Sequence, residues 1–319
     1  MNELNTKKFK ARLLLAAVLT TLTLLSGCSS SDYKTASCYL EEGKYAQAKE
    51  LFTSLGDYKD SAEKIIVCDY ALADTLLTQG RYEEAAAAFR ALDGYSDSSE
   101  KAFTALVRNV QTIHSDAAAG DIITFGAYEQ DNDLENGAEP IRWIVLAREN
   151  NKLFLVSLHA LDSQAYNNSW ADVTWETCTL RTWLNENFYQ EAFSTVEQKL
   201  ILLTDLPADA NDKYGTAAGS NTQDKVFLLG ISEAKQHFST DAQRMCVPTP
   251  YAIAQGAWAQ DDYTNEDGNE TCFWWLRSPG NDLNHSAYVH LDGSINTNGT
   301  LVSYKNRAAR PAIWIDLSE

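Results

Sequence analysis

The chain has 319 residues, 45% of them hydrophobic, which is enough apolar material for about two domains of ordinary size. Its formal net charge at pH 7 is −18. A chain this acidic repels phosphate backbones, so nucleic-acid binding is excluded as a function.

The N-terminus has the sequence of a bacterial lipoprotein signal. Basic residues between Lys7 and Arg12 precede an uncharged run over 13–25, and the segment ends at Leu25-Ser-Gly-Cys28. This order of basic, apolar and small residues is typical of a secretory signal. The apolar run is shorter than the about 20 residues that cross a bilayer, and an uncleaved anchor is the alternative. We expect a signal peptide over 1–27 and lipid on Cys28, which would hold the protein outside the cytoplasm on the bacterial cell membrane.

Five cysteines follow Cys28, at positions 38, 68, 178, 246 and 272. They include no closely spaced pair, and zinc sites use such pairs, so we expect no metal on them. In an exported protein a disulfide such as Cys38–Cys68 is one alternative, and buried free thiols are the other.

Residues 32–118 contain an internal repeat. Gly43 to Phe52 aligns with Gly80 to Phe89, and the identities extend to Asp60-Ser61 and Asp97-Ser98. A period of this size is typical of stacked helical hairpins.

Both copies share the pattern Gly-x-Tyr-x-x-Ala-x-x-x-Phe, in which Tyr45, Ala48 and Phe52 form one apolar stripe of a helix. The pattern resembles the core of tetratricopeptide repeats. The resemblance implies an all-α domain over 28–118 with a turn at each glycine. Such arrays bind peptides in a concave face, but two repeats are few, and we favour a spacer or docking platform.

Beyond Gly120 the composition changes, and all eight tryptophans lie there. Apolar runs predict strands at 122–125, 141–146 and 153–158, the last two as a hairpin. Helical spacing covers 180–188, and Ser194 with Glu197 forms a capping box for a further helix.

The rest of the chain alternates in the same way. We expect a buried strand at 225–229 and a short helix at 232–238. Asp292-Gly293 predicts a tight hairpin turn. Further strands are expected at 273–277, 287–291, from 295 onward and at 312–317. These elements predict an α+β domain over 119–319 with mostly antiparallel strands.

This second segment resembles a bacterial family described as domain of unknown function 6273. The resemblance runs in order through nearly the whole segment and includes Leu180-Arg-Thr-Trp-Leu-Asn185, Trp274-Trp-Leu-Arg-Ser-Pro-Gly280, Asp292-Gly-Ser-Ile295 and Arg310-Pro-Ala-Ile-Trp314.

A fainter resemblance links Trp275-Leu-Arg-Ser278 and Arg310-Pro-Ala to C-type-lectin-like domains of the formylglycine-generating-enzyme type. It implies a similar fold. Those enzymes use a cysteine pair, for which Cys246 and Cys272 are the candidates. We expect Arg277 and Arg310 to pair with buried carboxylates or carbonyls.

Motifs of catalysis and metal binding are missing from the sequence, including the nucleophile elbow, the zinc-protease helix and the dinucleotide fingerprint. An EF-hand starting at Asp131 would need Gly and Glu where Asn136 and Arg142 stand. His285 and His290 have opposite parity on a strand, so we expect no shared metal. We expect no catalytic residues, no cofactor and no metal.

A cluster of aromatic and polar residues late in the chain is the candidate binding site. Aromatic faces next to amides and carboxylates are typical of sugar sites. The alternative for the adjacent tryptophans is that each packs into one core layer. The candidate residues are Trp274, Trp275, Asp282, Asn284, His285 and Tyr288, and we expect the last four to be largely exposed on a polar loop and the strand that follows it.

The features together predict a lipoprotein whose C-terminal domain binds a glycan, a cell-wall component or a protein. The alternatives are an enzyme, either related to the formylglycine-generating group or an unrecognised hydrolase, and an envelope scaffold that acts through the repeats.

Overall fold

The computed structural model describes residues 29–318. The expected signal peptide and Cys28, the expected site of lipid attachment, lie outside this range. Within it, no helix is both long and apolar enough to cross a membrane.

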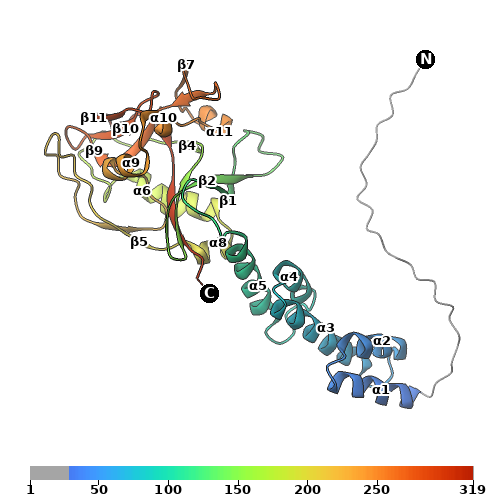
Figure 1. Cartoon of the computed structure of the whole chain (residues 1–319). Coiled ribbons are helices and arrows are strands. Elements are labelled where there is room, and N and C mark those ends of the chain that lie inside the picture. Colours follow the sequence, from blue (N-terminus) through green and yellow to red (C-terminus); the bar gives the residue numbers. More distant parts are fainter. Residues whose placement is uncertain (1–28, 319) are drawn as a thin grey trace, which may run out of the picture. The chain divides into compact units, whose positions relative to one another are not determined.

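The first compact unit covers residues 29–72 and consists of helices (Figure 1). Helix α1 (Ser29–Glu41) packs against α2 (Tyr45–Leu55), and α3 (Ser61–Thr78) begins within this unit. Ala48 and Phe52 of the expected stripe are fully buried. They share a small core with Ala36 and Cys68.

The two repeat glycines form the same turn. Gly43 and Gly80 have φ of 74° and 73°, a left-handed conformation that glycine adopts without steric cost. Each also donates its amide proton to the carbonyl three residues earlier. The sequence repeat is therefore matched by a repeat of backbone geometry.

The second compact unit covers residues 73–318 and holds α4 (Tyr82–Arg90), α5 (Ser98–Ile113) and all the strands. Helix α5 packs against α4 and against α8 (Thr195–Leu200). Ser194 and Glu197 form the predicted capping box of α8.

The first sheet of this unit is antiparallel, in the order β1-β2-β3-β13. The expected hairpin of β2 and β3 is confirmed, with Trp143 opposite Ser157. Its strands are β1 (Ile122–Tyr128), β2 (Glu139–Glu149), β3 (Lys152–Ser157) and β13 (Ala312–Asp316).

The second sheet has the order β11-β10-β9-β12-β4, and only the β9–β12 pairing is parallel. Gly293, with φ of 81°, lies in the predicted turn between β10 and β11. The strands are β4 (Asp162–Ser163), β9 (Trp274–Pro279), β10 (His285–Val289), β11 (Ile295–Leu301) and β12 (Ala308–Ala309).

Short elements connect and cover these sheets. The helix expected over 180–188 is present, but its second half is a π-helical turn. The elements are α6 (Thr179–Trp183), η1 (Leu184–Phe188), α7 (Tyr189–Ala192), β5 (Thr204–Leu206), β6 (Thr222–Asp224), α9 (Ile231–His237), α10 (Asp241–Arg244), α11 (Pro250–Ala254), β7 (Ala259–Thr264) and β8 (Glu270–Cys272).

The prediction of a strand at 225–229 is wrong. Val226 to Leu229 are buried as predicted, but the segment bonds to β13 only through Phe227 and Ala312 and to β9 through Leu229 and Arg277. A segment that changes partner within three residues forms no continuous ladder, although its apolar composition is that of a strand.

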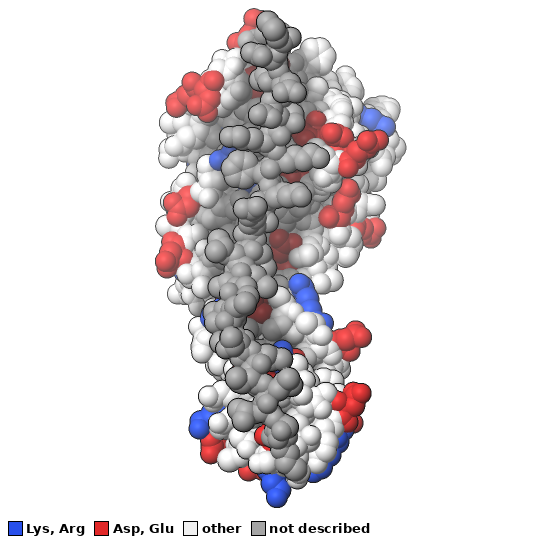
Figure 2. Space-filling view, turned by 90° about the vertical axis from the view of Figure 1, so that its right-hand side faces the viewer, with Lys and Arg blue, Asp and Glu red and all other residues white. Residues whose placement is uncertain are grey.

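The acidic composition is visible on the surface. On the face shown in Figure 2, Asp and Glu side chains are spread widely and do not gather into one patch. The helices of the N-terminal part followed by a region of mostly antiparallel strands give an α then α+β layout.

Candidate functional site

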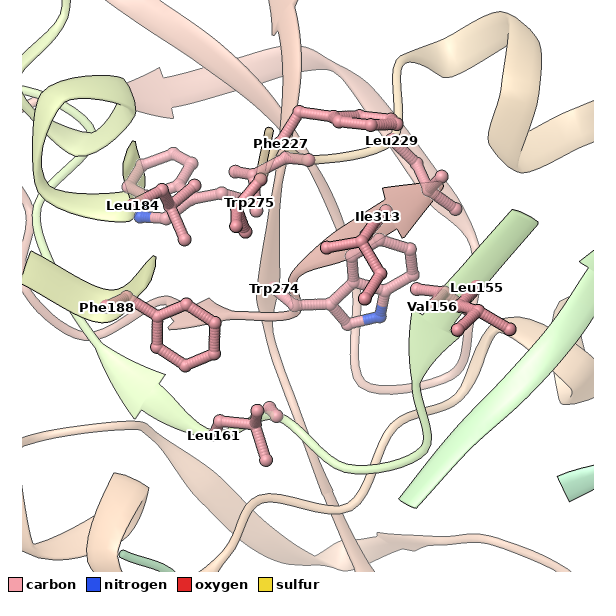
Figure 3. Packing of buried hydrophobic residues seen from close by; sticks show 14 of the residues in the cluster. Leu155, Val156, Leu161, Leu184, Phe188, Phe227, Leu229, Trp274, Trp275 and Ile313 are labelled. Atoms are coloured by element: carbon pink, nitrogen blue, oxygen red, sulfur yellow. The ribbon is translucent and has the colours of Figure 1, made fainter. Parts of the chain in front are cut away.

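Trp274 and Trp275 are both fully buried (Figure 3). Neighbouring residues on β9 point to opposite faces of the strand, and both faces are covered. The indole nitrogen of Trp274 donates to the Arg244 carbonyl at 3.0 Å, and that of Trp275 to the Gln164 carbonyl at 2.9 Å. Neither ring has a face that a ligand could contact, so neither tryptophan belongs to a binding site.

The prediction that Tyr288 is exposed is wrong, so Tyr288 does not belong to the candidate site either. It is 7% exposed and packs edge-on against Phe273. The Arg307 guanidinium lies 4.8 Å from its ring centroid, and Asn296 donates to its hydroxyl at 3.0 Å. Tyr288 therefore belongs to the packing of the β10–β11 hairpin.

The remaining candidates are Asp282 and Asn284, in the loop between β9 and β10, and His285, the first residue of β10. Asp282 is exposed as expected, whereas Asn284 and His285 are half-buried and so less exposed than expected. The Asp282 carboxylate lies 2.7 Å from Nδ1 of His285 and accepts the Asn284 amide at 3.2 Å. His290 instead lies 3.3 Å from Asp292, so the two histidines have different acidic partners. The loop thus offers a fixed carboxylate at the surface.

An exposed tryptophan that was not among the candidates lies on a segment bonded to this loop. Trp170 is 72% exposed. Its segment is hydrogen-bonded near both ends: the Asn167 amide donates to the carbonyl of Val302, directly after β11, and the Val173 amide donates to the carbonyl of Leu283 in the β9–β10 loop, each at 2.9 Å. Val302 in turn donates to the Asn284 carbonyl.

Polar residues surround Trp170 in its own segment. Asn168, Ser169 and Asp172 are exposed. The side chain of the buried Asn167 donates to the Ser169 carbonyl at 2.9 Å, which holds the turn in shape. The sequence pattern that indicates this surface is an aromatic residue flanked by Asn, Ser and Asp. We call residues 167–173 and 282–285 the Trp170 surface.

A separate apolar cavity of about 260 Å³ lies between Gln130, Asp131, His159 and the segment 247–250. Burial lowers the pKa of His159 from its usual 6.5. Its ring therefore favours the neutral form near pH 7.

The contacts expected for the two arginines are present: Arg277 pairs with Glu233, and Arg310 donates to the Ser157 carbonyl at 3.0 Å. The Arg310 guanidinium also lies 4.9 Å from the Trp274 ring centroid.

All five cysteines at positions 38, 68, 178, 246 and 272 are free thiols, and only Cys38 is exposed. The Cys272 amide donates to the Cys246 carbonyl at 2.8 Å, and both residues are buried. Burial raises the pKa of Cys272 well above its usual value. The two cysteines are therefore neighbours in the structure, but solvent does not reach them.

By fold, the second unit is an α+β domain with a four-stranded sheet, a five-stranded sheet, two two-stranded sheets and a large hydrophobic core. The family model described as Domain of unknown function (DUF6273) matches residues 150–317, just over half of the chain. The chain belongs to this family. Searches of the curated proteins and of the solved structures found no match.

Proposed function

We propose that the protein is a lipid-anchored, extracytoplasmic binding protein whose second unit recognises a glycan of the bacterial cell envelope. The lipid would be carried by Cys28, the last residue of the signal-like segment. The helices would form a short tetratricopeptide-like stalk or docking platform, and the binding domain would have a C-type-lectin-like fold.

The observation that carries this proposal is the exposure of Trp170 on a segment that is hydrogen-bonded at both ends. Because the backbone is already fixed, little ordering entropy is lost when a ligand binds. A sugar ring can stack its C–H face on the indole, and its hydroxyls can bond to carboxylates and amides. Asp282 and Asn284 supply these polar groups.

The surroundings of Trp170 favour a glycan over a protein partner. Protein interfaces are centred on clusters of apolar and aromatic residues. The neighbours of Trp170 within its segment include Asn168, Ser169 and Asp172, which are short and polar. Such groups match the hydroxyls of a polysaccharide.

The enzyme alternative related to the formylglycine-generating group depends on accessible cysteines. Cys246 and Cys272 are both buried, and a nucleophilic thiolate must be accessible to its substrate. This geometry does not favour the alternative, so we propose binding without catalysis.

The test is co-sedimentation of the full chain, purified in detergent, with isolated envelope polysaccharide. We expect Trp170→Ala to weaken binding by about tenfold or more, which corresponds to about 1.4 kcal/mol. The matched control is Trp258→Ala, since Trp258 is the other tryptophan that is more than half exposed, at 52%.

Two results would contradict the proposal. One is that the unaltered chain binds no envelope polysaccharide at all. The other is that both variants bind as well as the unaltered chain, which would remove the Trp170 surface from the site. Binding that is retained by the helical repeats alone would favour the scaffold hypothesis instead.

A further inference from the structure

Three carboxylates meet where β1 leads into β2. Glu129 directly follows β1, Glu139 is the first residue of β2, and Asp131 lies in the loop between them. One carboxylate oxygen from each of the three lies within 4.8 Å of the others. This group is separate from the Trp170 surface and does not depend on its function.

Glu129 is the unusual member of this group. It is 7% exposed, and its Oε1 atom is buried without a hydrogen-bond partner. A buried carboxylate oxygen without a partner is costly, and native proteins rarely leave one unmatched. A carboxylate oxygen of Glu129 also lies close to two further acids, and burial raises the pKa of Glu129.

No compensating cation is provided by the part of the chain that the structure describes. Over residues 29–318, none of the three carboxylates forms an ion pair with Lys or Arg. Buried charges in proteins are paired with an opposite charge or coordinate a metal.

We propose that Glu129, Asp131 and Glu139 bind a calcium ion. Calcium takes oxygen ligands at about 2.3–2.6 Å, so two ligands of one ion can be up to about 5.2 Å apart. The observed separations fit this limit. Asp131 is exposed and Glu139 half-buried, which leaves one side open for water ligands.

Hydrogen bonds from neighbouring groups hold two of the carboxylates in place. Asp131 accepts from the Asp133 amide and from the Asn136 side chain, each at 2.8 Å. Glu139 accepts from the Gln130 amide at 2.7 Å. Such hydrogen bonds orient the carboxylates that bind a metal.

The ligand set differs from the EF-hand that the sequence excluded, because it combines two residues at strand ends with one residue of the loop. Magnesium is the poorer candidate. It needs a near-ideal octahedron and keeps several of its waters, whereas the buried Glu129 oxygen is placed for direct coordination.

The experiment titrates the full chain, freed of metal with a chelator, with calcium chloride in a calorimeter. We expect one ion per chain, with a dissociation constant no weaker than the about 10⁻⁴–10⁻³ M of extracellular modules. Bound calcium should also raise the thermal unfolding midpoint, because it binds the folded state.

The decisive variant is Glu129→Gln, which keeps the shape and removes the charge. We expect this variant to raise the dissociation constant for calcium by about tenfold or more. Glu135→Gln is the matched control. Glu135 is an exposed acid of the same loop outside the group, and its removal should change affinity by less than about twofold.

Folding of the variants is checked by their unfolding midpoints in chelator. If Glu129→Gln fails to fold, Glu139→Gln takes its place with the same expected loss of affinity. The proposal is overturned if calcium gives neither heat nor a midpoint shift. It is also overturned if the Gln variants at 129 and 139 bind as the unaltered chain does, or if magnesium binds equally well.

Discussion

The indole nitrogen of Trp175 donates to the carboxylate of Asp224 at 2.9 Å, with both side chains buried. The other oxygen of Asp224 accepts from Nε of Arg181 at 2.7 Å. Trp175 lies two residues beyond the segment that carries Trp170. This buried hydrogen bond therefore anchors the C-terminal side of the Trp170 surface to the body of the unit.

Asp224→Asn is expected to destabilise the second unit by about 3 kcal/mol. That is the low end of the cost of breaking a buried ion pair, since Arg181 keeps some access to water. Urea denaturation of the full chain measures the change in the free energy of unfolding. A loss below about 1 kcal/mol would show that the carboxylate contributes no more than an average hydrogen bond.

Trp274→Ala is expected to cost about 3–5 kcal/mol of stability, because it empties a large volume in the core. It also removes the surface on which Arg310 lies. Trp170→Ala, at an exposed position, should change stability by less than about 0.5 kcal/mol. Equal effects of the two changes on the unfolding midpoint would contradict the assignment of one ring to the core and the other to the surface.

Acid is expected to destabilise the second unit as the pH falls below about 6.5. Burial lowers the pKa of both His114 and His159 from 6.5. Below that value the unfolded chain binds more protons than the folded one, so stability falls as pH falls. The double change His114→Gln and His159→Gln should flatten the dependence of the unfolding midpoint on pH between about 6.5 and 5. An unchanged slope would assign the acid sensitivity to other groups.

Cys28→Ser should abolish lipid attachment and leave an uncleaved precursor, because the hydroxyl cannot replace the thiol as the acylated atom. Mass spectrometry of the chain and membrane fractionation of the producing cells measure both effects. A variant that is cleaved and sediments with membranes like the unaltered chain would refute the lipoprotein assignment.

Local sequence patterns predicted those elements that depend on local contacts. The hairpin of β2 and β3, the capping box at Ser194 and the turn at Gly293 all lie where the sequence predicted them. Each depends on residues that are close together in the sequence. Hydrophobic periodicity and turn chemistry carry the information in such cases.

Elements that depend on distant partners could not be predicted in this way. The 225–229 segment has the composition of a strand, but its neighbours in space are parts of β9 and β13. The two-residue strand β12 pairs in parallel with β9 and antiparallel with β4, and nothing in Ala308-Ala309 indicates either partner. Such pairings are decided by the packing of the whole unit.

The candidate site was predicted in part. The sequence placed Asp282 at the surface of a loop, where it lies. It could not decide which tryptophans are covered, because burial of both faces of β9 depends on elements far away in the chain. Trp170 was missed for the converse reason: a single aromatic residue outside a strand or helix has no periodic pattern.

The chain closes both sheets with its last segment. Ala308 and Ala309 complete the second sheet between β9 and β4, and three residues later β13 joins the edge of the first sheet beside β3. Between them, Arg310 is buried against Trp274. Neither sheet can be completed until this segment has been synthesised, and pairings between distant segments form slowly. A chain exported as proposed would therefore keep both sheets incomplete, and stay able to pass through a membrane, until residues 308–316 have crossed.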